Sequence, residues 1–251
     1  MFIINDETPD HLWQVPADQT TGLDLSSRPN PGGFGYGATA SPFPDELLIP
    51  RSEWRDRIQE MEDTKSRISD WIRLKKLPVK NQGRTNFCWA NAPVTCLEII
   101  RIMSGQRMVE LSPASVACQI NGFRNQGGWG KDALDWLIDH GAYPADKWPA
   151  NAIDSKYLTS TPDRYTVEEW FELIPRNVDQ LMSMLLRRVP VAIGLNWWGH
   201  EVTAIDPVWK DGQPAIRILN SWGDTWGANG QAILQGSKML PDDAVCPRVA
   251  G

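Results

Sequence analysis

The chain of 251 residues, 41% of them apolar, is long enough for one large hydrophobic core or two small lobes. Its net charge of −6 and the lack of any Lys/Arg cluster argue against nucleic acid or an anionic membrane as the main partner. No apolar run approaches the ~20 residues that a membrane span needs. The N-terminus has neither a basic nor an apolar signal-peptide region, so we expect a chain that is not classically secreted.

Residues 1–50 are rich in proline and glycine and show neither a helical nor a strand period. Such a segment cannot bury a core of its own. It is therefore a disordered tail, an arm that docks on an assembly partner, or a strap across the domain that follows. Disordered tails are usually poor in aromatic residues, and this segment contains Phe2, Trp13, Phe34, Tyr36 and Phe43. The two docked alternatives are favoured.

The first half of the remaining chain is predicted to be mostly helical. Residues 51–69 predict an amphipathic helix capped by Ser52, which is either a linker and scaffold helix or a pro-segment-like element. Residues 88–104 predict a buried helix that ends at Gly105. Further along, LSPAS (111–115) is typical of a helix start, and NQGGWG (125–130) of a glycine loop. The stretch 131–144 predicts an amphipathic helix stopped by Gly141.

After about residue 164 the pattern changes to strands. The predicted strands are YTVEEWFEL (165–173), PVAIGL (190–195), EVTAID (201–206), AIRILN (215–220) and QAILQG (231–236), with one short helix at 177–188. A helical half followed by a strand half indicates an α+β protein with two lobes.

Cys88 stands at the start of the predicted buried helix, where unpaired backbone amides and the helix dipole favour a thiolate. A cysteine nucleophile also needs a base, a group that orients the base, and donors for the oxyanion. His11 lies in the arm and His140 precedes a helix-stop glycine, so we expect both to be structural or solvated. His200 and Asn220 lie beside predicted strands, which can bring them together so that the Asn oxygen sets the imidazole tautomer.

Four separated motifs in residues 70–251 resemble those of the papain-like cysteine peptidases. They are KNQGRTNFCWA around Cys88 with Asp70–Trp71 upstream, LEIIRIMSG, GGWGKDALDWL, and NSWGDTWGANGQAIL. The resemblance implies a papain-like two-lobe fold for a catalytic domain at 70–251. A helical lobe at about 77–163 would hold the central helix after Cys88, an antiparallel β-barrel-like lobe would span about 164–245, and the active-site cleft would lie between them.

The resemblance also implies roles for individual residues. Cys88 would attack the carbonyl, His200 would pair with it and protonate the leaving amine, and Asn220 would orient His200. Gln82 would donate to the oxyanion together with the Cys88 backbone N–H. The implied reaction is hydrolysis of a peptide or protein substrate through an acyl-enzyme, with no cofactor and no metal.

Substrate-binding roles follow in the same way. Gly127 and Gly128 would bind an extended peptide through their backbones. Trp222 would shield the Asn–His contact from water, and Trp226 would pack beside the leaving-group side of the cleft.

The chain departs from the family pattern at several positions. Thr85 and Asn125 stand where secreted members usually carry a disulfide, which favours a disulfide-free protein in the cytoplasm or within a virus particle. Only NWWG separates the strand at 190–195 from His200, so part of the cleft wall is shortened. Glu201 follows His200 where a small apolar residue is usual. The alternative function is a structural or assembly component that keeps the fold and docks through residues 1–50.

Overall fold

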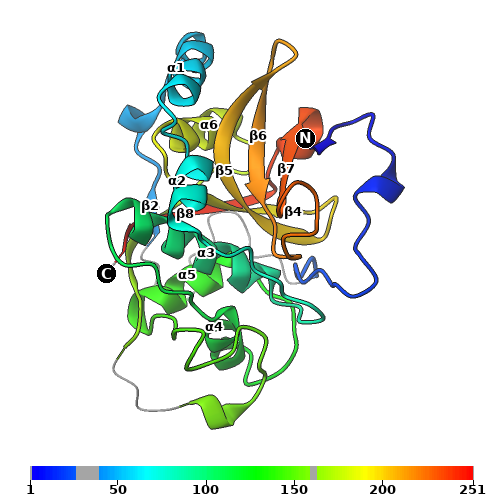
Figure 1. Cartoon of the computed structure of the whole chain (residues 1–251), viewed down its shortest axis with the longest axis vertical. Coiled ribbons are helices and arrows are strands. Elements are labelled where there is room, and N and C mark those ends of the chain that lie inside the picture. The colour runs from blue at the N-terminus through cyan, green and yellow to red at the C-terminus, as the bar shows by residue number, and fades with distance from the viewer. Residues whose placement is uncertain (1, 27–39, 159–162, 251) are drawn as a thin grey trace.

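The computed structural model describes residues 2–26, 40–158 and 163–250, and it confirms the α+β class. The α-helices are α1 (Arg51–Asp63), α2 (Ile68–Lys75), α3 (Cys88–Met103), α4 (Pro113–Ile120), α5 (Gly130–Asp139) and α6 (Val178–Leu186). The strands are β1 (Ile3–Ile4), β2 (Ala40–Pro42), β3 (Val167–Glu172), β4 (Val191–Leu195), β5 (His200–Lys210), β6 (Gln213–Leu219), β7 (Gln231–Gln235) and β8 (Asp243–Ala250). Helices α3, α4 and α5 form one half of the molecule, and the curved sheet with α1 and α6 forms the other (Figure 1).

The strands form one sheet in the order β1-β7-β6-β5-β4-β8-β3-β2. Its central pairs are antiparallel, whereas both edges are parallel pairs, β1 with β7 and β2 with β3. Both edge strands therefore come from residues 1–50, for which the sequence predicts no strand. They form because the edges of the sheet offer unpaired backbone groups, a signal that periodicity does not carry. Strand β8 was also not predicted.

The single helix predicted from Ser52 is wrong in one respect, because the chain forms two helices there. Helix α1 starts after Pro50 without a side-chain cap, so Ser52 lies inside its first turn. The break between the two helices contains Lys65, whose backbone is left-handed with a φ of 51°. Helix α2 then begins after Arg67, whose backbone N–H donates to the Asp70 carboxylate at 3.3 Å.

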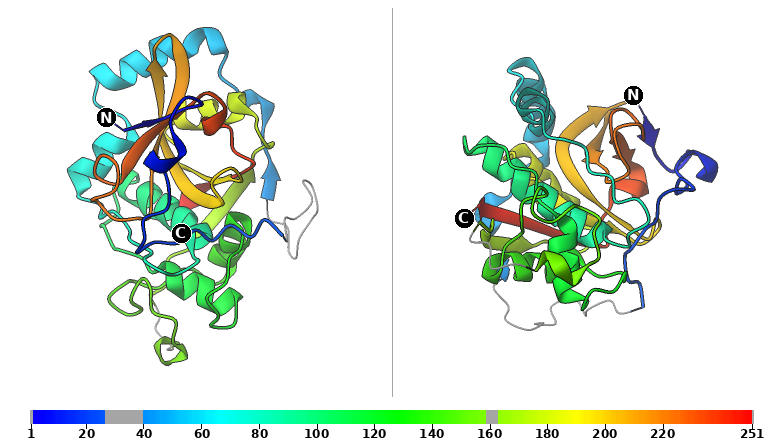
Figure 2. Two further views of the ribbon diagram at one scale, coloured as in Figure 1. Left: turned by 90° about the vertical axis from the view of Figure 1, so that its right-hand side faces the viewer. Right: turned by 60° about the horizontal axis from the view of Figure 1, so that its bottom comes forward.

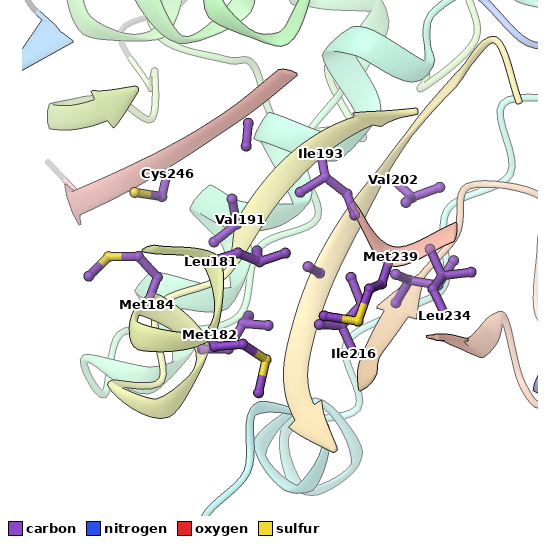
Figure 3. Packing of buried hydrophobic residues seen from close by; sticks show 14 of the residues in the cluster. Leu181, Met182, Met184, Val191, Ile193, Val202, Ile216, Leu234, Met239 and Cys246 are labelled. Carbon is purple, nitrogen blue, oxygen red and sulfur yellow. The ribbon is translucent and has the colours of Figure 1, made fainter. Parts of the chain in front are cut away.

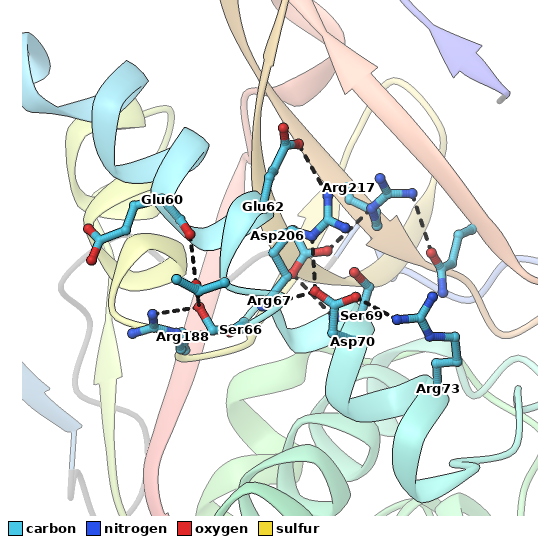
Figure 4. Close-up of polar contacts among 12 residues, drawn as sticks. Glu60, Glu62, Ser66, Arg67, Ser69, Asp70, Arg73, Arg188, Asp206 and Arg217 are labelled. Carbon is cyan, nitrogen blue, oxygen red and sulfur yellow. Dashed lines mark hydrogen bonds and ion pairs between the residues drawn. The ribbon is translucent and has the colours of Figure 1, made fainter.

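A polar network fastens this break to the sheet (Figure 4). The buried carboxylate of Asp206 on β5 accepts from the backbone N–H of Ser69 at 3.3 Å and lies 3.3 Å from the Arg217 guanidinium. On the other side, Arg188 donates to the carbonyl and hydroxyl oxygens of Ser66, both at 2.8 Å. Helices α1 and α2 are thus packed parts of the domain.

Two large hydrophobic cores lie on either side of the boundary between the halves. In the sheet half, Leu181 of α6 lies beside Val191 of β4, and Met182 and Met184 of the same helix belong to the same cluster (Figure 3). In the other half, α3 is buried among α4, α5, β4 and β8. Because the Cys88 end of α3 lies at the boundary, a residue there can meet side chains from both halves. No helix in the described part of the chain is long and apolar enough to cross a membrane.

Residues 2–26 run from β1 along one side of the sheet and then cross the boundary toward the helical half (Figure 2). Aromatic contacts hold this segment: the ring of Phe2 meets Trp226 edge-on at 5.6 Å, and the ring of Trp13 meets Trp197 at 5.0 Å. Residues 2–26 of the arm therefore cross their own domain, and we call this segment the strap. Phe34 and Tyr36 lie outside the described residues.

Candidate active site

Cys88 is the first residue of α3 and is fully buried. Backbone N–H groups of Glu201, Trp89 and Gly22 are directed at its sulfur, and these hydrogen bonds favour the thiolate. Burial outweighs them and, with a smaller contribution from the Glu201 carboxyl, raises the pKa of the Cys88 thiol well above its usual value. The helix start that the sequence predicts is present, but burial favours the neutral thiol.

His200 and Asn220 are brought together as predicted. The Nε2 atom of His200 lies 2.7 Å from the Oδ1 atom of Asn220. The same Oδ1 accepts the backbone N–H of Ser221 at 2.8 Å, which identifies it as the oxygen of the amide. Since this oxygen can only accept, the imidazole proton is on Nε2, and Nδ1 is the basic nitrogen. Nδ1 has no hydrogen-bond partner among the described residues.

Trp222 covers this pair. Its ring stacks on the His200 ring at 4.5 Å between centroids with 25° between the planes. Both side chains are almost fully buried, so water is kept from the His–Asn contact. Burial lowers the pKa of His200 to about 4, although the Asn220 hydrogen bond acts in the opposite direction.

Gln82 is fully buried, and hydrogen bonds to both ends of its side-chain amide define the orientation of that amide. Its Oε1 accepts the Ser221 hydroxyl at 2.6 Å, so its Nε2 is the donor side. Nε2 donates to the backbone carbonyls of Thr20 at 3.0 Å and Thr85 at 2.9 Å. The indole N–H of Trp222 donates to the same Thr20 carbonyl at 3.1 Å.

The strap passes through this site. The Gly22 carbonyl accepts the Gly128 backbone N–H at 3.0 Å, and the Asp24 N–H is directed at the Gly128 carbonyl at 3.4 Å. Between them, Leu23 forms a parallel bridge with Gly128 and donates its N–H to the Gly199 carbonyl at 3.2 Å. Residues 20–24 therefore occupy the cleft as an extended peptide.

Glycines make this close approach possible. A Cβ at Gly22 would overlap the Asn86 carbonyl, and a Cβ at Gly127 would lie 2.6 Å from the Gly22 carbonyl oxygen. A Cβ at Gly128 would press on the Trp89 ring at 2.7 Å. Gly128 contacts the strap through its backbone, which is the kind of contact predicted for a substrate peptide. Gly127 lacks a side chain, and this leaves room for the Gly22 carbonyl.

Trp226 lies in an aromatic cluster beside the strap. Its ring is 5.9 Å from Trp198 and 5.8 Å from Trp222. Trp197 and Trp198 come from the short NWWG turn, and their rings stack at 5.1 Å.

Asn125 performs the bridging that a disulfide would provide. Its Oδ1 accepts the Asn86 N–H at 2.7 Å, and its Nδ2 donates to the Arg84 carbonyl at 3.0 Å. All four cysteines are free thiols in the described part of the chain. His11 and His140 lie away from the site, and the His140 ring packs on Trp136 at 4.0 Å.

Sequence reasoning missed Thr20, Gly22 and Leu23, which fill the cleft, and Ser221, which orients Gln82. The strap residues carry no motif, and only the aromatic content of the arm hinted that it packs. Ser221 lies inside the NSWG motif, and its role depends on a contact with a residue 139 positions away. No group of three or more metal-ligating side chains was found within the described ranges.

Comparisons with known proteins identify the family of the chain. Residues 66–202, more than half of the chain, match the papain family cysteine protease model. The chain belongs to the papain family of cysteine proteases. Cathepsin L 1 of Paramecium tetraurelia is 30% identical to this papain-family chain over 246 residues, covering 90% of the chain and 76% of the relative. Cathepsin L 2 of the same organism is 31% identical over 188 residues, covering 66% and 59%.

Solved structures confirm the papain-like fold. The proform of the cysteine protease Amb a 11, a ragweed pollen allergen, has a TM-score of 0.59 and 22% identity, covering 68% of this chain and 62% of that chain. At this identity the likeness shows the fold alone. The chain spans more than two thirds of one Paramecium relative and less than two thirds of the other.

Proposed function

We propose that the chain hydrolyses peptide bonds with Cys88 as nucleophile, His200 as base and acid, and Asn220 as the orienting residue. The Cys88 sulfur bonds to the carbonyl carbon while Gln82 donates to the oxyanion, and His200 protonates the leaving amine as the C–N bond breaks. Water then attacks the thioester, which releases the carboxylic acid and restores the thiol.

One observation carries this proposal: the 2.7 Å contact between His200 Nε2 and Asn220 Oδ1 under the stacked Trp222 ring. This contact leaves Nδ1 as the basic nitrogen of a histidine whose neighbour, Glu201, directs its backbone N–H at the Cys88 sulfur. A buried histidine held in one tautomer, directly before a residue whose backbone contacts the thiol, is suited to general base catalysis. The membership of this chain in the papain family of cysteine proteases also supports peptide-bond hydrolysis by a cysteine nucleophile.

We also propose that the strap keeps the enzyme inactive in this conformation. The Thr20 carbonyl already takes the Gln82 donor, and Gly22 presents an N–H rather than a carbonyl carbon to the Cys88 sulfur. A neutral thiol and a neutral imidazole agree with a closed state. The solved proform of the ragweed protease supports a precursor state for this fold. An assembly role for the arm has less support, because residues 20–24 occupy the cleft of their own chain.

Peptide hydrolysis by the chain of 251 residues tests both the catalytic mechanism and its inhibition by the strap. In Gly22→Ala, the added methyl group overlaps the Asn86 carbonyl and should displace the strap without touching the catalytic side chains. We expect this variant to hydrolyse a fluorogenic peptide library about tenfold or more faster than the wild type. A loss of about 1.4 kcal/mol in the free energy with which the strap binds the site produces that factor.

Two controls define the outcome. Leu25→Ala, at a strap residue that is 51% exposed, should behave as wild type. Cys88→Ala combined with Gly22→Ala should have no activity. Hydrolysis that survives Cys88→Ala contradicts the proposed mechanism, and equal rates for Gly22→Ala and wild type contradict closure by the strap.

A further inference from the structure

Three residues on neighbouring strands form one row beneath Leu23 of the strap. Gly194 on β4 pairs with Glu201 on β5 and with Asp243 on β8. Directly paired residues of adjacent strands project to the same face of a sheet. Gly194 has no side chain, and both methyl carbons of Leu23 lie 3.5 Å from the position that a Gly194 Cβ would take. The Leu23 side chain thus fills a gap in a row that carries two carboxyl groups.

Glu201 is buried in an unusual way for a carboxyl group. It is 1% exposed, and its Oε2 accepts the backbone N–H of Gly130 at 3.0 Å. Its Oε1 has no hydrogen-bond partner within the described part of the chain. Burial, with the nearby Asp243 carboxylate, raises the pKa of Glu201 well above its usual value. An acceptor left unsatisfied in the protein interior destabilises the fold.

A purely structural role explains only part of this arrangement. Oε2 caps the first turn of α5 through Gly130, and a helix N-terminus favours a negative group. A glutamine oxygen would accept the same hydrogen bond without the cost of a buried carboxyl. The cap also leaves the buried Oε1 of Glu201 without a donor.

We propose that the pocket now filled by Leu23 is the subsite for a lysine or arginine side chain of the peptide substrate, selected by Glu201 and Asp243. The inference rests on the proposed peptidase function, and it names the class of substrate. A basic side chain supplies the donor that Glu201 Oε1 lacks, and its charge favours the ionised carboxylates. Leu23 supplies neither, so a basic peptide competes well against the strap for this pocket.

Peptides that differ only in charge test the preference. In the Gly22→Ala background, arginine and its neutral isostere citrulline are compared at each position on the acyl side of the scissile bond in turn. At one position we expect kcat/KM to be about tenfold or more higher for arginine, the ratio that 1.4 kcal/mol produces. At that position, Glu201→Gln with Asp243→Asn should remove the preference. The readout is the ratio of the arginine and citrulline rates within each variant, because the Glu201 carboxyl also raises the pKa of the Cys88 thiol and its removal changes both rates together.

Matched variants separate charge from folding. Glu201→Gln keeps an oxygen for the Gly130 N–H, so the α5 cap survives. Asp139→Asn removes an exposed carboxylate from the same helix and should leave the arginine preference intact. Equal rates for arginine and citrulline at every position, or a preference that survives the double variant, overturn the proposal.

A binding measurement keeps this result separate from catalysis. Peptides in the cleft should protect Cys88 from iodoacetamide, and the arginine peptide should protect at about one tenth of the citrulline concentration. If Gly22→Ala hydrolyses no peptide yet shows this difference in protection, the peptidase proposal fails and the basic subsite stands. If it hydrolyses peptides while both peptides protect equally, the basic subsite fails and the peptidase proposal stands.

Discussion

The backbone carbonyl of Thr20 accepts a hydrogen bond from the side-chain amide of Gln82 at 3.0 Å. Gln82 is the donor that the proposed mechanism assigns to the oxyanion, so a residue 62 positions earlier holds it in the closed conformation. The oxyanion donor, the thiol and the glycine edge of the cleft are all contacted by the five residues 20–24. The state of the active site and the position of the strap are therefore coupled.

Trp13 should anchor the strap. Its ring packs edge-on against Trp197, its carbonyl accepts the Trp198 indole N–H at 3.1 Å, and the Lys238 ammonium lies 5.1 Å from its ring centroid. An aromatic pair and a cation–π contact each contribute about 0.5–1.5 kcal/mol. Trp13→Ala should therefore raise the rate of Cys88 alkylation about tenfold, with Leu25→Ala as the unchanged control. A rate equal to wild type would show that the strap is held elsewhere.

The opened site should contain an ion pair between Cys88 and His200. At pH 6 a free thiol with a pKa of about 8.5 is less than about 1% ionised, whereas an ion pair keeps the thiolate populated. In the Gly22→Ala background, alkylation of Cys88 at pH 6 should be about 100-fold slower after His200→Ala. The two variants should converge near pH 9, where the thiol ionises unaided. Equal rates at pH 6 would exclude the ion pair.

Asn220 should act through His200. Asn220→Ala removes the acceptor for both the imidazole N–H and the Ser221 N–H. General acid–base catalysis contributes about 10²–10⁴ in rate, and a histidine that can rotate loses part of it. In the Gly22→Ala background, we expect kcat to fall about tenfold or more, with partial recovery in Asn220→Asp, which restores an oxygen. An unchanged kcat and pH profile for Asn220→Ala would remove this residue from the mechanism.

Glu201 should make stability depend on pH with a definite sign. Its folded-state pKa is raised by burial, so between its unfolded value and that raised value the folded chain holds a proton that the unfolded chain releases. This proton favours folding at low pH, and the advantage is lost as the pH rises from the unfolded-state pKa of Glu201 toward its raised folded-state pKa. Glu201→Gln should thus be more stable than wild type at pH 8, with a smaller difference at pH 5. Urea unfolding at both values measures this, and a difference that grows toward pH 5 contradicts the assignment.

Lys80 and Glu98 form a buried ion pair that supports α3. Lys80 Nζ lies 2.8 Å from Glu98 Oε1, and the same oxygen accepts the Leu111 N–H at 2.6 Å. Glu98→Ala leaves the buried ammonium without its counter-ion, which should lower the free energy of unfolding by about 3–5 kcal/mol. Glu110→Ala, at an exposed glutamate nearby, should change it by less than about 0.5 kcal/mol. A loss below about 1 kcal/mol for Glu98→Ala would show that water reaches Lys80.

The sequence by itself determined the α+β class, the helix that starts at Cys88, and the catalytic candidates. These depend on local signals: a helical period, strand-forming runs, and motifs around Cys88, His200 and Asn220 whose residue types carry the chemistry. The sequence also indicated that residues 1–50 pack on something, because aromatic side chains gain from burial.

Only the tertiary structure decided where the strap lies and what it does to the site. The contacts of Thr20 with Gln82 and of Leu23 with Gly128 join residues 62 and 105 positions apart. On the strap side both contacts use backbone atoms, so the side-chain types of the strap carry no pattern that predicts them. The row Asp243–Gly194–Glu201 depends on strand register, which is set when the whole sheet forms. The break between α1 and α2 is held by distant contacts of Ser69 with Asp206 and of Ser66 with Arg188. Ionisation depends on the same packing, because burial favours the neutral forms of both the Cys88 thiol and the His200 imidazole.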